Sequence, residues 1–312
     1  MLMAKAEITK FSAIRGIQRK IWCILFRALR RFPIFAVKTY TVSDGYCCHY
    51  RDYPAAGTPR GRVVFVHGIQ SHAGWYEHSC RRLSEAGFSV SFLDRRGSGQ
   101  NAQARGDTPS FRRLLDDIAD FLRPLRQQSP ELPIYLAGIS WGGKPVAALQ
   151  RRHPGLCDGL ALLCPGFCPQ VRPSRKERLG IVWSRLTAPS RLFPVPLSDP
   201  QLFTATPRWQ EFIRHDPLSL RQATARFFVE SVRLDLYLRF PVSHVRLPVL
   251  LLLAEHDRII DNSRTRAFVE RFPTPEKEVH EYAGAHHTLE FEENPEPFIA
   301  DLLHWLERQT AR

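Results

Sequence analysis

Short apolar stretches alternate with amphipathic ones along most of the chain. The compact apolar runs, which are typical of buried strands, lie at residues 62–68, 88–94, 133–138, 157–164, 247–254 and 277–284. Between them, apolar residues recur at helical spacing, as in the segment that opens at Ser110 and in the one that ends the chain. Strands that alternate with helices favour a mostly parallel sheet covered by helices on both faces. The pattern therefore predicts an α/β fold.

Two stretches depart from this alternation. Residues 36–43 and 46–53 are short strand-like runs on either side of Asp44 and Gly45, which predicts a hairpin. Residues 165–246 lack strand alternation, and a stretch of that length is too long for a loop inside a compact domain. We therefore expect a helical insertion there, a cap over one end of the sheet. The predicted organisation is a core (37–164 and 247–312), a cap (165–246) and an N-terminal helix (1–36).

The N-terminal segment is strongly basic. Residues 1–43 hold nine lysines or arginines and one acid, whereas the net charge of all 312 residues is +13. Over residues 10–33 the apolar positions recur at steps of three and four, which predicts an amphipathic helix. Its charges and short apolar runs exclude a membrane span and a cleaved signal peptide. Two interpretations stay open: a helix docked on the protein body, or a helix lying in a membrane interface beside anionic headgroups.

Composition narrows the class of protein. A hydrophobic content of 44% excludes a disordered chain. The seven cysteines are scattered without a C-x-x-C pair, so we expect buried thiols in the cytoplasm, with peripheral contact to the inner face of a membrane as the open alternative. Cys164 and Cys168 lack the companions of a zinc site, and neither metal nor cofactor is expected. No nucleic-acid-binding module accompanies the basic segment, so nucleic acid is not an expected partner.

One predicted strand ends in a glycine-rich turn that contains a serine. Residues 138–142 read Gly-Ile-Ser-Trp-Gly, the pattern G-x-S-x-G, between an apolar run and a helical stretch. Glycines suit such a turn because neighbouring Cβ atoms would obstruct it, and the turn exposes the serine Oγ at the edge of the sheet. The following helix also directs unpaired backbone N–H groups toward that point. Ser140 is therefore the candidate nucleophile.

Later strand ends supply candidates for the base and the acid that a serine nucleophile needs. Asp257 follows the apolar run that ends at residue 254, and His286 and His287 follow the run at 277–284. Ser140, Asp257 and His287 have the order nucleophile, acid and base that accompanies a G-x-S-x-G turn. Each lies at the carboxyl end of a strand, where open α/β sheets place their sites.

Other residues compete for these roles. Asp261 is an alternative acid, but it opens a helical segment, which favours a role as N-cap. His286 is an alternative base, and spacing alone does not decide between it and His287. His256 lies on the turn of the acid, which favours a structural role.

The negative charge of a tetrahedral intermediate requires two N–H donors, an oxyanion hole. His67, Gly68 and Ile69 follow a strand-like run that should neighbour the strand of the nucleophile. The backbone N–H groups of Ile69 and Trp141 are the candidate donors, and we expect His67 to be structural.

Together these motifs resemble the α/β-hydrolase superfamily, in particular the branch of monoacylglycerol lipases, lysophospholipases and serine aminopeptidase-type hydrolases. The resemblance covers about residues 37–308, through the matching segments 64–76, 92–101, 136–149, 215–220, 247–261 and 282–292. It implies an α/β-hydrolase fold with a helical cap inserted after strand 6 that shapes an acyl-chain tunnel. It also implies His287 as the base, Asp257 as the acid, and Ile69 and Trp141 as the oxyanion donors. The chain departs from the family pattern at Trp141, where methionine or glutamine is usual.

The resemblance implies a cofactor-free serine esterase or lipase. Its expected substrates are esters of single-chain lipids, such as monoacylglycerols or lysophospholipids, cleaved through a Ser-His-Asp triad and an acyl-enzyme. An aminopeptidase, a thioesterase or an acyltransferase with the same triad is the first alternative. A non-catalytic binding protein on a hydrolase fold is the second.

Overall fold

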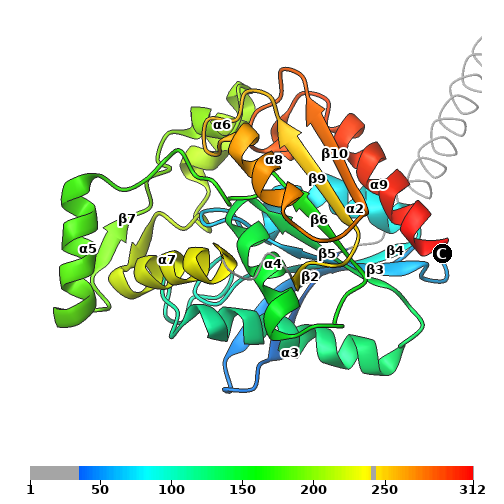
Figure 1. Ribbon diagram of the computed structural model, residues 1–312, viewed down its shortest axis with the longest axis horizontal. Coiled ribbons are helices and arrows are strands. Elements are labelled where there is room, and N and C mark those ends of the chain that lie inside the picture. Colours follow the sequence, from blue (N-terminus) through cyan, green and yellow to red (C-terminus); the bar gives the residue numbers. More distant parts are fainter. Residues whose placement is uncertain (1–34, 240–243, 312) are drawn as a thin grey trace, which may run out of the picture. The chain divides into compact units, whose positions relative to one another are not determined.

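The computed structural model of the chain describes residues 35–239 and 244–311 (Figure 1). A single compact unit runs from Phe35 to Arg312. The amphipathic helix predicted over residues 10–33, and the membrane contact predicted for it, lie outside the described residues. Among the helices that are described, each is too short or too polar to reach across a bilayer.

An eight-stranded sheet forms the centre of the unit, with the order β1-β2-β4-β3-β5-β6-β9-β10. Its strands are β1 (Ala36–Thr41), β2 (Cys47–Tyr53), β3 (Gly61–Val66), β4 (Phe88–Leu93), β5 (Ile134–Ile139), β6 (Gly159–Leu163), β9 (Val249–Ala254) and β10 (Lys277–Tyr282). β1 and β2 form the predicted hairpin, and β2 joins β4 antiparallel, while all pairs from β4 to β10 are parallel. The prediction of a mostly parallel sheet is therefore confirmed. β5, β6 and β9 are buried at every position, as expected for strands covered on both faces.

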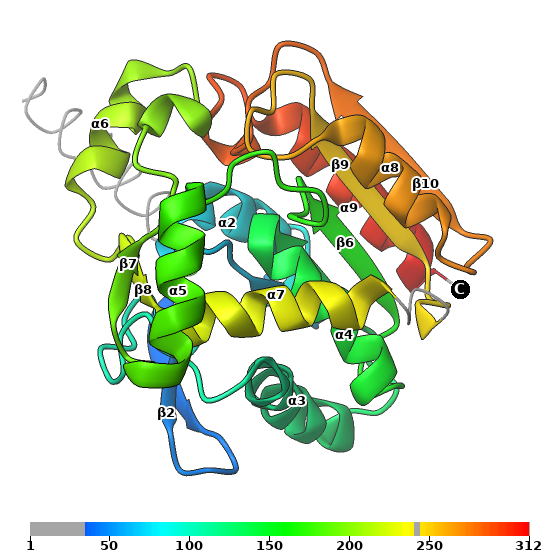
Figure 2. The ribbon, with the colours of Figure 1, turned by 60° about the vertical axis from the view of Figure 1, so that its left-hand side comes forward.

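Helices cover both faces of the sheet. They are α2 (Glu77–Glu85), α3 (Phe111–Gln128), α4 (Gly143–Arg152), α8 (Asn262–Glu270) and α9 (Glu296–Thr310). α2 contacts α9, and α3 contacts α4; Figure 2 shows α8 in front of β9 and α9 behind it. The Ser110 side chain caps α3 by accepting a hydrogen bond from the N–H of Arg113, at 3.1 Å, as expected for a serine that opens an apolar helical pattern.

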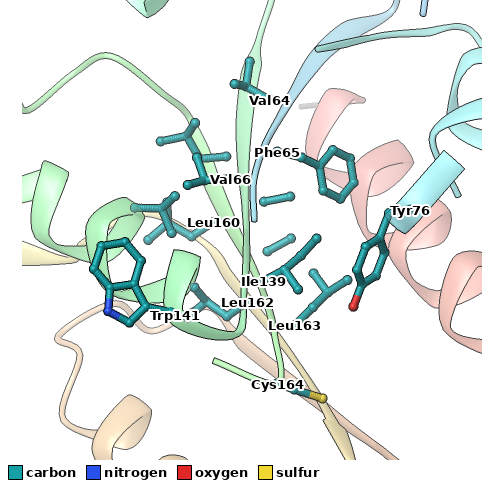
Figure 3. Packing of buried hydrophobic residues seen from close by; sticks show 14 of the residues in the cluster. Val64, Phe65, Val66, Tyr76, Ile139, Trp141, Leu160, Leu162, Leu163 and Cys164 are labelled. Carbon is teal, nitrogen blue, oxygen red and sulfur yellow. The ribbon is translucent and has the colours of Figure 1, made fainter. Parts of the chain in front are cut away.

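Aromatic and branched side chains fill the space beside the strands. The rings of Phe65 and Phe92, from the neighbouring strands β3 and β4, stack at 5.2 Å. Figure 3 shows Phe65 and Tyr76 on one side of the strands and Trp141 on the other. The carboxyl ends of β3, β5 and β9 thus project from a tightly packed layer, which holds the loops that follow them in fixed positions.

The chain between β6 and β9 leaves the sheet and forms the cap. Its elements are α5 (Arg175–Thr187), β7 (Leu192–Pro194), η3 (Pro200–Leu202), α6 (Pro207–His215), β8 (Gln222–Thr224) and α7 (Ala225–Arg239). Besides these helices, the insertion contains one small sheet, in which β7 and β8 pair antiparallel. These strands are three residues long, too short to show alternation, and their pairing joins segments far apart in the sequence. α7 lies against α3 and α4 and so connects the cap to the core.

A buried carboxylate joins the cap to the loop after β3. Asp216 Oδ2 accepts hydrogen bonds from His72 Nε2 at 3.0 Å, from the Trp75 indole N–H at 2.8 Å and from the Ser219 hydroxyl at 2.7 Å. Burial by itself raises the pKa of this carboxyl group, but the hydrogen bonds, that of His72 first, outweigh burial and hold the pKa well below its usual range. Asp216 therefore stabilises the folded chain when it is ionised.

Replacing this carboxylate should destabilise the protein in a pH-dependent way. We expect Asp216→Asn to lower the free energy of unfolding by about 2–3 kcal/mol at pH 7, because the buried donors lose a charged acceptor. A carboxyl whose folded pKa is lowered contributes stability above its unfolded pKa of about 3.9 and loses it as the pH falls. The difference between wild type and variant in urea unfolding should therefore shrink by about 1 kcal/mol between pH 7 and pH 3.

The matched control is Asp199→Asn, a change at an exposed cap residue whose carboxylate accepts only the N–H of Gln201 within the described residues. It should cost a few tenths of a kcal/mol, because Asn caps nearly as well as Asp. Equal losses in the two variants, or a difference that does not change with pH, would contradict the role given to Asp216.

Candidate active site

Ser140 sits on a sharp, strained turn between β5 and α4, in the short 3₁₀ helix η2 (Ser140–Gly142). Its φ angle is +51°, a left-handed conformation that non-glycine residues rarely adopt. A Cβ atom at Gly142 would lie 2.1 Å from the Val66 carbonyl oxygen, and one at Gly138 would lie 2.5 Å from Val146 Cγ2. The two glycines therefore allow strands and helix to close around the serine. Such strain costs about 1–3 kcal/mol and collects at functional sites.

The structure brings Ser140, His287 and Asp257 into one hydrogen-bonded chain. Ser140 Oγ lies 2.9 Å from His287 Nε2, and His287 Nδ1 lies 2.7 Å from Asp257 Oδ2. The carboxylate fixes the tautomer, since Nδ1–H donates to Asp257 and Nε2 is left to accept the serine proton. Asp257 Oδ1 also accepts the N–H groups of Ile259, at 2.8 Å, and Ile260, at 3.0 Å. Both the imidazole and the carboxylate are buried, with 3% and 0% of their side chains exposed.

The competing residues have other partners. Asp261 Oδ1 caps α8 by accepting the N–H of Arg264 at 2.9 Å. His286 faces Glu292, with 3.2 Å between Nδ1 and Oε1, and the His256 ring lies against His286. His67 is fully buried; its Nδ1–H donates to the Gly68 carbonyl at 2.7 Å.

The candidate oxyanion donors flank Ser140. Ile69 lies on the loop after β3, and Trp141 follows Ser140, where the first N–H groups of a helix have no partner in the preceding turn. An added Cβ atom at Gly166 would lie 3.2 Å from the Trp141 nitrogen, so the glycine keeps space open beside this donor. The Trp141 indole is held by the cap, because its N–H donates to Ser231 Oγ on α7 at 2.8 Å.

Arg95 was not among the residues predicted from the sequence, yet it contacts the loop that carries Ile69. Its guanidinium donates to the carbonyls of Gly68 and Ile69 at 3.0 and 2.9 Å. It lies shortly after β4 and next to Arg96, whose guanidinium instead pairs with Asp117. Two adjacent arginines carry no local signal that distinguishes them, since only the packing of strand, loop and cap turns one of them inward.

A large cavity opens from the serine toward the cap. Its volume is about 1070 Å³, and its lining includes Ile69, Ser140 and Trp141 together with side chains of α5, α7 and α8. Most of the lining residues are apolar. The volume slightly exceeds the range of about 300–1,000 Å³ that is usual for small-molecule sites. The cavity is therefore large enough to hold a long apolar group beside Ser140.

One cluster near the triad has ligand atoms of the kinds that bind metals. Atoms of Cys164, Asp257 and His287 lie within 4.8 Å of one another. Burial raises the pKa of the Cys164 thiol well above its usual range, so it stays protonated and is a poor ligand. The His287 nitrogen that faces this cluster already donates its proton to Asp257. The cluster fits a hydrogen-bonded triad better than a metal site.

Comparison with known proteins identifies the family of this chain. The family model "Serine aminopeptidase, S33" matches residues 57–294. Human monoglyceride lipase is 24% identical over 274 residues, which cover 86% of this chain and 89% of that one. Lysophospholipase L2 of Escherichia coli is 27% identical over 207 residues, which cover 60% and 61%.

Solved structures share the fold. A soluble variant of monoglyceride lipase from Saccharomyces cerevisiae, in complex with a substrate analogue, superposes with a TM-score of 0.77 at 19% identity, over 89% of this chain and 96% of that one. That likeness concerns the fold, and the family match concerns more than half of the sequence. The chain thus belongs to the serine aminopeptidase S33 family of α/β-hydrolases, with relatives among the lipases and esterases.

Proposed function

We propose that this protein hydrolyses carboxylic esters of single-chain lipids with Ser140 as nucleophile. The observation that carries the proposal is the chain of hydrogen bonds from Ser140 to His287 to Asp257, at 2.9 and 2.7 Å. These lengths are within the range that proton transfer from a serine requires. Ser140 also lines a large, mostly apolar cavity, which suits an acyl chain.

The reaction proceeds in two halves. Ser140 Oγ attacks the ester carbonyl while its proton passes to His287 Nε2, and Asp257 stabilises the imidazolium. The tetrahedral oxyanion accepts hydrogen bonds from the N–H groups of Ile69 and Trp141. As the intermediate collapses, His287 returns the proton to the leaving alcohol, and the acyl group stays on Ser140. Water then gives a proton to His287 as it attacks the acyl-enzyme, and His287 passes that proton to Ser140 Oγ as the fatty acid leaves.

The lining of the cavity favours esters over the peptides of an aminopeptidase. An aminopeptidase needs a carboxylate to bind the free ammonium group of its substrate. Asp235 is the one acidic residue in the lining among the described residues, and it is paired with Lys144 Nζ at 2.7 Å. A carboxylate neutralised by a buried lysine is a poor receptor for a second cation.

Within the lipid esters, the cavity favours substrates with an anionic group. Five arginines, exposed to solvent, contribute to its lining: Arg172, Arg178, Arg239, Arg264 and Arg271. None of the five pairs with a carboxylate in the described part of the chain. Positive charge around a cleft of low dielectric raises the local concentration of anions. A lysophospholipid with a net negative headgroup therefore suits this arginine-lined cavity better than an uncharged monoacylglycerol does.

The preference for an anionic headgroup is testable by neutralising two of these arginines. Arg178 on α5 and Arg264 on α8 take part in no ion pair with described residues. The double variant Arg178→Gln with Arg264→Gln therefore removes two positive charges without breaking an ion pair. We expect kcat/KM for lysophosphatidylglycerol to fall about tenfold, as two exposed ion pairs of about 0.5–1 kcal/mol each would give. The value for monoacylglycerol of the same chain length should change less than about twofold, because an uncharged head gains nothing from the arginines.

The control is Arg112→Gln with Arg208→Gln, which removes the same charge from exposed positions outside the cavity. It should leave both kcat/KM values close to those of the wild type. The same assay, extended to aminoacyl arylamides, tests the proposed class of reaction. Faster cleavage of amides than of esters by the wild type would reject the ester hydrolase and favour the aminopeptidase.

A further inference from the structure

Arg95 is a buried cation without a carboxylate partner. Only 7% of its surface is exposed. Its neighbour Asp94 is engaged elsewhere, since the two carboxylate oxygens accept the backbone N–H groups of Ala73, at 2.8 Å, and Gln100, at 2.9 Å. Within the described chain, Arg95 Nε and Nη1 have no acceptor. Burial lowers the pKa of Arg95 to about 9, which still leaves it charged at neutral pH. Burying a cation without a carboxylate partner costs free energy, which suggests that the positive charge of Arg95 has a function at this place.

The carbonyl that Arg95 binds belongs to the peptide unit of an oxyanion donor. Arg95 Nη2 donates to the oxygen of Gly68, and the nitrogen of that same peptide unit is the N–H of Ile69. A peptide unit is planar, with its N–H pointing opposite to its carbonyl. Fixing the Gly68 oxygen therefore fixes the direction of the Ile69 N–H. His67 adds a second hydrogen bond to the same oxygen, and its Nε2 accepts the backbone N–H of Arg95 at 3.0 Å.

The other donor residue lies against the same guanidinium. Arg95 Cζ is 4.8 Å from the centre of the Trp141 ring and 5.7 Å from that of Phe227 on α7. The two aromatic rings are 5.5 Å apart. Figure 3 shows the Trp141 ring on the opposite side of the strands from Phe65 and Tyr76. A cation–π contact of this kind favours a fixed position of the aromatic ring relative to the guanidinium.

We propose that Arg95 is a positioning residue that orients and polarises the oxyanion hole. It holds the Ile69 donor through the Gly68 carbonyl and the Trp141 donor through its ring. Hydrogen bonding to a cation polarises the peptide and makes its N–H a stronger donor. The positive charge also lies behind the place where negative charge develops, in surroundings of low dielectric. The inference rests on the proposed ester hydrolysis.

The decisive comparison is between Arg95→Met, Arg95→Lys and the control Arg105→Met. Arg105 also donates to backbone carbonyls, those of Gly99 and Leu218, but neither belongs to an oxyanion donor. In Arg95→Met we expect kcat to fall about 10- to 100-fold with KM within about threefold, less than the 10²–10³ of a directly removed donor. Arg95→Lys keeps the charge and should recover part of kcat. Arg105→Met should leave kcat within about twofold.

A second readout separates positioning from general support of the fold. An alkyl boronic acid forms a tetrahedral, negatively charged adduct on the serine, whereas a monoalkyl glyceryl ether of equal chain length only fills the cavity. The affinity of Arg95→Met for the boronic acid should fall in parallel with kcat, and its affinity for the ether should be unchanged. Equal losses for both ligands, or kcat within twofold of the wild type, would overturn the inference. If Arg95→Met does not fold, Arg95→Lys with reduced kcat and boronate affinity supports it, and full activity rejects it. A wild type that hydrolyses no ester and binds no boronate would instead reject the proposed function.

Discussion

Ser140→Ala is expected to reduce ester turnover by about four orders of magnitude or more. Loss of the nucleophile in a Ser-His-Asp triad removes covalent catalysis entirely and leaves only the contribution of binding and the oxyanion hole. The measurement is kcat for a p-nitrophenyl ester of medium chain length, with the purified full chain. The fold should be unaffected, because alanine tolerates the left-handed backbone of position 140 no worse than serine does and no side-chain packing is lost.

The binding of lipid provides the control for this variant. Ser140→Ala should bind a monoalkyl glyceryl ether as the wild type does, because the cavity is unchanged. A variant that keeps more than about a hundredth of wild-type turnover would show that another residue performs the attack.

Asp257→Asn is expected to lower kcat by about 10³- to 10⁴-fold. The substituted amide can donate to His287 Nδ1 instead of accepting from it, which favours the wrong imidazole tautomer and leaves Nε2 protonated. The imidazolium that forms during attack also loses its countercharge. The loss should appear in kcat for the same p-nitrophenyl ester, with little change in KM, since Asp257 lies behind the histidine, its side chain fully buried.

Asp261→Asn is the matched control, four residues further along the same loop. Its carboxylate accepts the N–H of Arg264 at the start of α8, and asparagine serves that role nearly as well. We expect kcat within about threefold of the wild type. Similar losses in the two variants would mean that Asp257 is not the acid of the triad.

The sequence was sufficient to predict the alternation of strands and helices, because buried parallel strands and amphipathic helices leave strong periodic patterns. It was also sufficient to select three residues at strand ends, because parallel strands bring their carboxyl ends to one edge. The choice between His286 and His287 needed the family comparison. The structure places His287, 2.9 Å from Ser140, within reach of the serine, while His286 faces Glu292.

Other features of the structure have no recognisable pattern in the sequence. The short strands β7 and β8 pair across the cap, and their pairing depends on contacts that no local spacing encodes. Arg95 could not be told from Arg96, since its burial depends on the loop after β3, the turn at Ser140 and the cap helix α7 together. The arginines around the cavity come from separate segments of the chain and are neighbours only once the cap has folded.

Labelling with a fluorophosphonate probe, followed by mapping of the modified peptide, tests the central claim most directly. The probe reacts with a serine only when a base has activated it. We predict one modified site, at Ser140, with labelling abolished in Ser140→Ala and strongly slowed in Asp257→Asn. Absence of labelling in the folded wild type, or modification at another serine, would contradict the account.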